Sequence, residues 1–252
     1  MPLPKVITSQ YELILPSSNK TIKYRPFLVK EEKILLEASE SKNKTQVINA
    51  IKQILRNCIL TKGIKVEEMP SFDIEYIFLN ARAKSAGENL DLIVTCGDDG
   101  ETKVPVTVFI DEIQVEKDPE HSRDIDLGNN TILRMKYPSL KQFVENSFIF
   151  DSSEEKEEDE VNVNKIENVN KSFKIIASCI DVIFNEQDSY AASDCTEKEL
   201  FDFLDNLTNQ QFKMIEKFFD TMPVLRHEIV VKNPKTGIEN TVILQGLTSF
   251  FI

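Results

Sequence analysis

The sequence predicts an α+β fold in which β-hairpins and a small antiparallel sheet are combined with amphipathic helices, with a mainly helical C-terminal half. Apolar and polar residues alternate near both ends of the chain and in its middle, as in half-buried strands. Between these stretches apolar residues recur at helical spacing. The expected organisation is an N-terminal α+β region with a central antiparallel sheet (1–150), an acidic linker (151–164), and a helical region closed by a β-hairpin (165–252).

The N-terminal region opens with a predicted hairpin. Residues 11–29 read YELILPSSNKTIKYRPFLV and alternate on both sides of the polar turn PSSNK. Residues 44–60 follow as a predicted helix with one buried face, made of Val47, Ile48, Ile51, Ile54, Leu55, Cys58 and Ile59. A further helix is expected from Ser71, its candidate N-cap, to a stop at Gly87. Its inward residues are Ile74, Ile77, Phe78 and Ala81.

The middle of the chain predicts the central sheet. Residues 90–110 form a pair of strands around the turn GDDG, and 111–117 and 124–138 extend the β region. Residues 139–150 predict a short helix. The run DSSEEKEEDEVN then begins the linker, because it offers few apolar residues to bury. The same run is also compatible with a docking strip for a basic partner.

The C-terminal region predicts helices up to Pro223. One helical stripe consists of Ile166, Val169, Phe173, Ile176, Ile180 and Ile183. Two capping boxes, Thr196 with Glu199 and Thr208 with Gln211, open further amphipathic helices. The chain then returns to alternation around the turn NPKTG, which predicts a final hairpin.

Composition excludes several classes of protein. No apolar stretch reaches the roughly 20 residues of a membrane span, and the N-terminus lacks a signal-peptide core. The four cysteines are scattered, which fits a reducing cytoplasm better than a disulfide scaffold. A net charge of -12 disfavours binding to nucleic acid, because phosphate contacts need clustered lysine and arginine. A charged partner is therefore expected to be basic.

Candidate chemical sites are weak. His121 and His227 do not stand at metal-ligand spacing from a cysteine or from each other. Asp98, Asp99 and Glu101 crowd one turn, but they lack the spacing of a calcium loop. The chain has neither a phosphate-binding glycine-rich loop nor a nucleophile elbow. We therefore expect no catalytic residues, no cofactor and no enzymatic activity.

Three stretches carry a family resemblance. They are IKYRPFLVKEEKILLEASES near the start, ILRMKYPSL in the middle, and FFDTMPVLRHEIVV running into LQGLTSFF at the end. Read together, they resemble the baseplate hub proteins of T-even-type contractile-tailed bacteriophages, a family that holds both a hub subunit and a hub assembly catalyst. The resemblance implies a non-enzymatic role in virion assembly through contacts with other tail and baseplate hub proteins. It also implies a location in the host cytoplasm during assembly, or in the tail baseplate of the virion.

The resemblance also implies a departure from the family pattern. Relatives often carry a Cys-x-x-Cys-Gly knuckle in the turn of each hairpin, and two such knuckles have the spacing of a four-thiolate zinc site. At those positions this chain has Cys96 and Asp99 in one turn and Asn233 and Thr236 in the other, while Gly100 and Gly237 remain. We therefore expect no metal site, and packing in place of the metal if the two hairpins meet.

The last residues, Leu247, Phe250, Phe251 and Ile252, form an apolar tail. An exposed cluster of this kind is an aggregation hazard, so we expect it to be covered. Either the tail packs on its own domain, or it is the contact for a partner protein. Two further functions stay open from the sequence: a generic protein-binding adaptor, and a hydrolase with a scattered acidic site.

Overall fold

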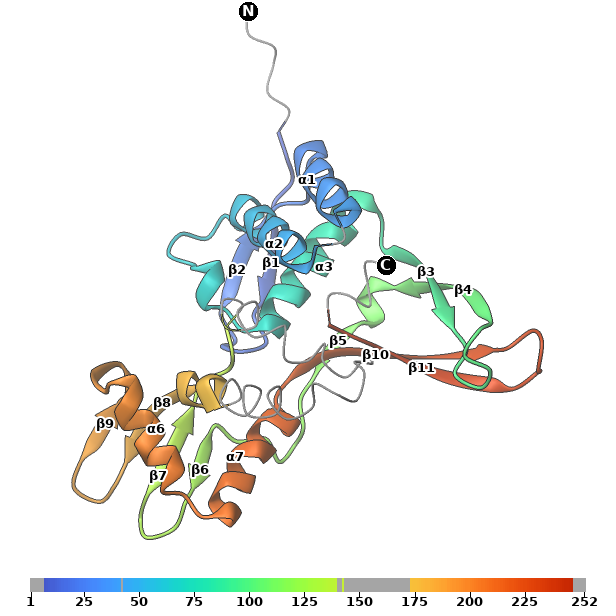
Figure 1. Ribbon diagram of the computed structural model, residues 1–252. Coiled ribbons are helices and arrows are strands. Elements are labelled where there is room, and N and C mark those ends of the chain that lie inside the picture. The colour runs from blue at the N-terminus through green and yellow to red at the C-terminus, as the bar shows by residue number, and fades with distance from the viewer. Residues whose placement is uncertain (1–6, 42, 140–141, 143–172, 247–252) are drawn as a thin grey trace, which may run out of the picture. The chain divides into compact units, whose positions relative to one another are not determined.

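A computed structural model describes residues 7–41, 43–139, 142 and 173–246. Contacts divide the chain into two compact units, residues 1–116 together with 223–252, and residues 117–222. Each unit is described by itself (Figure 1). These boundaries do not coincide with the ranges 1–150 and 165–252 expected from the sequence, and the range of the acidic linker lies outside the described residues.

The first unit begins with the predicted hairpin, β1 (Tyr11–Ile14) and β2 (Thr21–Tyr24), followed by the helices α1 (Val29–Glu40), α2 (Lys44–Cys58) and α3 (Ser71–Ala86). A short 3-10 helix, η1 (Val66–Glu68), precedes α3. The N-cap of α3 is Pro70, one residue before the Ser71 expected from the sequence, whereas the helix ends before Gly87 as predicted. Gly87 has a φ of 111°, a conformation that glycine adopts without a Cβ clash.

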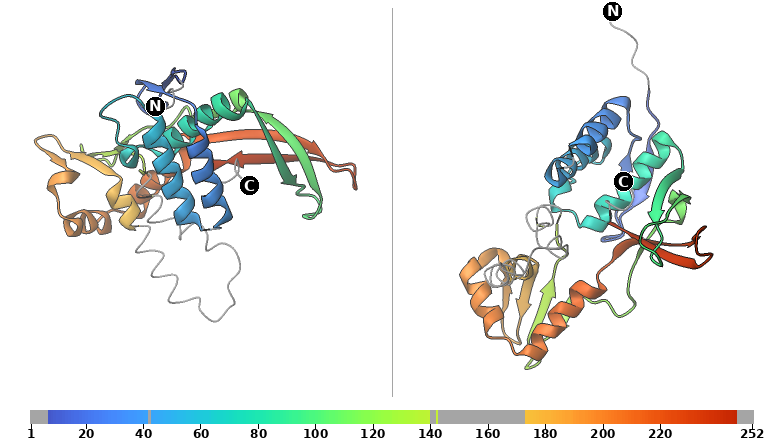
Figure 2. Two further views of the ribbon diagram at one scale, coloured as in Figure 1. Left: turned by 90° about the horizontal axis from the view of Figure 1, so that it is seen from above. Right: turned by 45° about the vertical axis from the view of Figure 1, so that its right-hand side comes forward.

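The sheets of this unit come from both ends of its sequence. The strands β3 (Asn89–Thr95) and β4 (Lys103–Phe109) form one hairpin, followed by η2 (Ile110–Glu112). The strands β10 (Val224–Lys232) and β11 (Glu239–Gln245) form the other hairpin. The short strand β5 (Gln114–Glu116) pairs with β10 on the side opposite β11. The sheet order is therefore β11-β10-β5. Further views show the β3–β4 hairpin running beside the β10–β11 hairpin (Figure 2).

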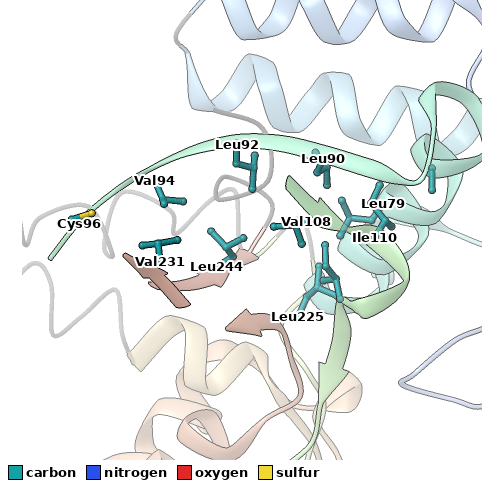
Figure 3. Packing of buried hydrophobic residues seen from close by; sticks show 12 residues of the cluster. Leu79, Leu90, Leu92, Val94, Cys96, Val108, Ile110, Leu225, Val231 and Leu244 are labelled. Atoms are coloured by element: carbon teal, nitrogen blue, oxygen red, sulfur yellow. The ribbon is translucent and has the colours of Figure 1, made fainter. Parts of the chain in front are cut away.

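The two hairpins share one core. Leu92 and Val94 of β3 lie over Val231 and Leu244, with Cys96 at the end of the row (Figure 3). Each of these residues is buried. Since burying one such aliphatic side chain contributes roughly 1.5–3 kcal/mol, this layer stabilises two hairpins that are marginal alone.

The second unit is a four-stranded antiparallel sheet of order β6-β7-β8-β9, with helices against one face. The strands are β6 (Asp124–Asp126), β7 (Ile132–Met135), β8 (Ile180–Phe184) and β9 (Ser189–Ala191). After η4 (Ala192–Asp194) come α6 (Glu197–Asp205) and α7 (Asn209–Thr221), both opened by the predicted capping boxes. Their residues Leu204, Ile215 and Phe218 join the core of the sheet.

The expectation of a mainly helical C-terminal half is wrong. In the described part of this half, the strands β8, β9, β10 and β11 accompany the helices α6 and α7. The clearest error is the predicted helix that includes Ile180 and Ile183, because both residues lie in the strand β8. The chain leaves its helix before Cys179, and β8 then pairs with β7 on one side and β9 on the other. Short apolar runs fit either period, and neighbouring strands decided this one. Ile166 and Val169 lie outside the described residues, as does nearly all of the short helix expected at 139–150.

Candidate functional site

The turns of the two long hairpins in the first unit meet and form one polar cluster, which we call the paired turns: residues 96–102 and 233–240. Each turn is closed by the same backbone bond, from Gly100 N to Cys96 O (3.0 Å) and from Gly237 N to Asn233 O (2.9 Å). The φ angles of these glycines are 68° and 75°, in the left-handed region that glycine tolerates. The turn geometry that the sequence pattern implied is therefore present in both hairpins.

Asp98 joins the paired turns. Its carboxylate accepts hydrogen bonds from Asn233 Nδ2 (2.8 Å) and from the Thr236 hydroxyl, and its backbone N–H donates to Asn240 Oδ1 (2.8 Å). The side-chain bond from Asn233, followed by that from Thr236, holds the pKa of Asp98 below its ordinary value. Asp98 is thus a charged acceptor that ties one turn to the other.

The neighbouring Asp99 serves its own turn. It accepts from the Thr102 hydroxyl and from the backbone N–H groups of Thr102 (2.9 Å) and Glu101 (3.1 Å). The Thr102 bonds are the main reason why the pKa of Asp99 is lowered. From the sequence these acidic residues crowd one turn, and the contacts of Asp99 stay within that turn. The long-range role of Asp98 was not predicted.

Asn233 and Asn240 were also missed as cross-hairpin contacts. Asn233 is fully buried, and its Oδ1 accepts from Lys235 N at 2.8 Å while its Nδ2 reaches Asp98. Asn240 follows the inward phase of Val242 and Leu244 along β11. An amide at an inward strand position was the available signal, since a buried polar group requires a partner.

The residues at the four knuckle positions do not fit a zinc site. Cys96 supplies a single buried thiol, and burial raises its pKa, which disfavours the thiolate that zinc requires. Asp99, Asn233 and Thr236 are engaged in the hydrogen bonds of the turns. Within the described residues, no three His, Cys, Asp or Glu side chains are grouped as a metal would need.

The opening stretch of the resemblance builds a buried ion pair. Glu31 in the first turn of α1 has no exposed surface, and it receives both terminal nitrogens of Arg25 at 3.0 and 3.3 Å. Leu28 N and Asn57 Nδ2 donate to the same carboxylate at 3.0 and 3.1 Å. Burial by itself raises the pKa of Glu31, but the bonds from Arg25 and Leu28 outweigh burial and leave it lowered. This pair was not predicted from the sequence.

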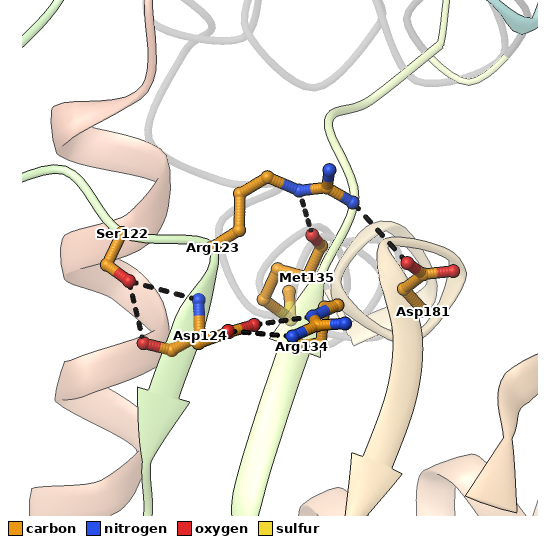
Figure 4. A network of polar contacts seen from close by, with 6 residues as sticks. All are labelled: Ser122, Arg123, Asp124, Arg134, Met135 and Asp181. Atoms are coloured by element: carbon orange, nitrogen blue, oxygen red, sulfur yellow. Dashed lines mark hydrogen bonds and ion pairs between the residues drawn. The ribbon is translucent and has the colours of Figure 1, made fainter. Parts of the chain in front are cut away.

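The middle stretch, ILRMKYPSL, begins with β7 of the second unit. Leu133 and Met135 are buried, whereas Arg134 lies on the opposite face with its guanidinium bonded to Asp124 at 2.6 and 2.9 Å (Figure 4). The beginning of the same sheet is fastened by Arg123, which donates to Met135 O (2.8 Å) and pairs with Asp181 (3.4 Å). These contacts hold three strands together and form no reactive centre.

The two histidines have structural surroundings. The Thr221 hydroxyl donates to Lys217 O, so it is left to accept from Nδ1 of His121 (3.0 Å). The Tyr137 hydroxyl then donates to Nε2 at 3.0 Å. Burial is the main cause of the lowered pKa of His121, in agreement with a neutral ring. His227 lies in β10 opposite Leu244.

The C-terminal stretch is split by the limit of the described residues. Pro223 precedes β10, the fully buried Leu225 lies within it, and β11 ends at Gln245. The partner-binding candidates Leu247, Phe250, Phe251 and Ile252 lie beyond, outside the described residues. Among the helices that the structure describes, none is long and apolar enough to cross a membrane.

Comparison with known proteins supports the resemblance over nearly the whole chain. The model of the family "T4 bacteriophage base plate protein" matches residues 8–252. The chain is 24% identical over 245 residues to the baseplate hub assembly protein gp26 of Enterobacteria phage T4, an alignment that covers 96% of this chain and 98% of that protein. No solved structure matches the chain.

The family match includes both paired turns and all of the described elements, from β1 to β11. The resemblance expected from the three sequence stretches is therefore confirmed. This chain belongs to the family of T4 bacteriophage base plate proteins.

Proposed function

We propose that this protein is a structural subunit or an assembly factor of the phage baseplate hub, and that it acts through protein contacts without catalysing a reaction. The observation that carries this proposal is the family match over residues 8–252. The similarity to a hub assembly protein along almost the full length of both chains supports the hub in particular.

The described polar residues support a scaffold in preference to an enzyme. The carboxylates of Asp98 and Glu31 form hydrogen bonds between elements, and the described hydrogen-bond partners of His121 are two hydroxyl groups. A general acid or base needs a proton-transfer position open to substrate. The proposed activity is therefore binding.

The proposed partners are other tail and baseplate hub proteins, with no nucleic acid among them. The net charge of -12 supports this choice, because like charge opposes approach to phosphate. We place the protein in the host cytoplasm during assembly, from where a structural subunit passes into the virion tail baseplate.

Quantitative mass spectrometry of purified particles and of infected-cell lysate tests the proposal. A hub subunit is expected in the particles at a fixed ratio to other baseplate proteins, and an assembly factor only in the lysate, where it co-purifies with them. Absence from particles together with no association in lysate would contradict both forms. Particles assembled normally from a phage lacking the chain would contradict them as well.

We further propose that the apolar tail, including Leu247, Phe250, Phe251 and Ile252, contacts such a partner. The test is a chain ending at Gly246. If the tail is the contact, the shortened chain keeps its unfolding midpoint and loses association with hub proteins. If the tail instead packs on its own domain, stability falls by about 1.5–3 kcal/mol for each buried phenylalanine. A shortened chain with full stability and full association excludes both roles.

A further inference from the structure

The first unit contains a pocket with a volume of about 340 Å³ beside β5. The pocket is formed by the end of the β1 hairpin, by α3, and by the segment from η2 into β5. Its lining residues are Ile14, Pro16, Tyr76, Asn80, Ile110, Asp111, Ile113, Gln114 and Val115. None of these residues belongs to the paired turns or to the buried ion pair.

The pocket lies against the edge strand of a sheet. β5 pairs with β10 through Gln114 opposite Arg226 and Glu116 opposite Val224, and it is the outermost described strand of its sheet (Figure 1). Alternate backbone N–H and C=O groups of an edge strand point away from its neighbour. An extended segment of another protein can pair with such an edge, while its side chains enter adjacent pockets.

The polar groups that line the pocket favour a hydrogen-bond donor. Asp111 is exposed and forms no ion pair with a described residue, and it is the sole charged residue of the lining. Asn80 uses its Nδ2 to donate to Tyr76 O (2.8 Å), so that its Oδ1 is left as an acceptor. A carboxylate and an amide oxygen together suit a cationic side chain with several N–H groups.

The apolar part of the lining suits the stem of the same side chain. Ile14 is 59% exposed although it lies in β1, and it lines the pocket with Pro16 and the half-buried Val115. Lysine and arginine bury their methylene stems along apolar surface while the charged group reaches polar partners. The half-buried ring of Tyr76 adds an aromatic surface on which a guanidinium stacks favourably.

We propose that the β5 edge and its pocket bind an extended segment of a partner protein that carries one arginine or lysine, which inserts between Asp111, Asn80 and Tyr76. Charge selects this occupant, because the lining holds the exposed Asp111 carboxylate and no basic residue to oppose it. A second copy of this chain is disfavoured, because two chains that each carry a net charge of -12 repel one another. The identity of the partner as another hub protein rests on the proposed function. The chemistry of the docking site is independent of it.

A random-peptide display library, selected on the immobilised full chain, tests the docking chemistry. We expect the selected peptides to share a basic residue at one position within an apolar or β-branched context. For a synthetic selected peptide, Asp111→Asn is expected to weaken binding about tenfold, and Ile14→Lys at least as much. The matched controls are Glu101→Gln and Ile93→Lys, which alter an exposed acid and a 68% exposed isoleucine elsewhere in the same unit and are expected to leave the affinity unchanged.

Two quantities are measured: the affinity for the peptide and the hydrogen exchange of backbone amides. Hydrogen exchange at the amides of residues 114–116 is expected to slow when the peptide binds. Selection of no peptide, of peptides without a basic position, or of peptides equally sensitive to the control substitutions overturns the proposal. Since the variants replace exposed side chains, an unchanged unfolding midpoint is the check that they fold.

Association with hub proteins in infected-cell lysate separates this inference from the proposed function. If the double variant Asp111→Asn with Ile14→Lys co-purifies with hub proteins as well as the unaltered chain does, the docking site is refuted while the hub role stands. If the unaltered chain fails to associate at all, the hub role is refuted, and the peptide experiment alone decides the docking chemistry.

Discussion

Individual polar residues hold the paired turns together. Asp98 accepts from Asn233 and Thr236 of the other hairpin, and Asn233 is fully buried. When a buried amide loses its partner, the cost of removing the amide from water is no longer offset by a hydrogen bond. The contacts at this end of the hairpins are therefore specific, whereas the aliphatic layer beneath them is nondirectional.

Replacing Asn233 with alanine is expected to lower the free energy of unfolding by about 1–3 kcal/mol, because the hydrogen bond to Asp98 and the acceptor for Lys235 N are lost together. Urea unfolding measures the change. Lys235→Ala, an exposed side chain in the same turn, is the control and is expected to change stability by less than about 0.5 kcal/mol. Equal losses in both variants would show that Asn233 has no special role.

Asp98→Asn is expected to lower the stability of the fold at pH 7 and to leave it unchanged in strongly acidic solution. The pKa of Asp98 is lowered in the folded chain, so its contribution is complete above the ordinary carboxyl pKa of about 4 and is lost as the pH falls through the folded value. Unfolding midpoints measured from pH 7 down to pH 2 should therefore approach one another as the pH falls below about 4. Asp111→Asn, which removes no described ion pair, is the control; a constant difference over this range contradicts the assignment.

The purified protein is expected to bind no zinc, since Cys96 is the one thiol among the four knuckle positions. Elemental analysis after dialysis against metal-free buffer measures the content. A stoichiometric zinc that survives dialysis and is lost in Cys96→Ser would show that a site exists. Zinc that persists in Cys96→Ser would place it elsewhere in the chain.

At the scale of elements, one buried ion pair connects three of them. Arg25 follows β2, Glu31 lies in α1, and Asn57 comes from α2. The connection is completed by Arg25 N, which donates to Cys58 O at 3.0 Å. The opening stretch that carries the resemblance is thus the joint between the first hairpin and the first helix pair.

Arg25→Met is expected to cost about 3–5 kcal/mol, because it leaves the buried Glu31 carboxylate without its principal cation. The double variant Arg25→Met with Glu31→Leu should recover part of that loss, since an apolar pair needs no compensating charge. Thermal and urea unfolding of both variants give the comparison. Lys30→Met removes a mostly exposed partner at 3.5 Å and should cost less than about 1 kcal/mol. A double variant less stable than the single one would contradict this account.

At the scale of the whole molecule, the chain leaves the first unit after β5 and returns to it at β10. Those two strands pair with each other, so the second unit is an insertion between paired neighbours. This arrangement brings residues 114–116 beside 224–226 and creates the β5 edge. Contacts between distant parts of the sequence thus define both the first unit and its candidate docking site.

Deletion of residues 151–164 is expected to leave the unfolding midpoint within about 2 °C, because a segment with so few apolar residues contributes little burial. A glycine-serine replacement of equal length is the control for chain length. A much larger loss of stability in both variants indicates that the acidic run packs or pairs with a basic surface. Normal stability with lost hub association instead identifies the run as a docking strip.

The sequence by itself determined the features whose hydrogen bonds are local. Thr196 with Glu199 and Thr208 with Gln211 cap helices as predicted, because a capping box spans only four residues. The final hairpin was equally predictable, since the alternation of Val231 and Leu244 and the turn around Gly237 lie close together in the sequence. The family was also accessible, because its three characteristic stretches stand in the sequence itself.

Only the tertiary structure decided which distant segments meet. Ile180 and Ile183 fit a helical stripe, but hydrogen bonds to β7 and β9 made their segment a strand. Asp98 became the link between the hairpins because Asn233, 135 residues away, lies opposite it. Periodicity reports which face of an element is buried, but it does not identify the element that covers that face. Burial of apolar surface is nondirectional, so many partners would satisfy it equally. The entropy of closing a long loop changes little with its length, so sequence separation does not select the partner either.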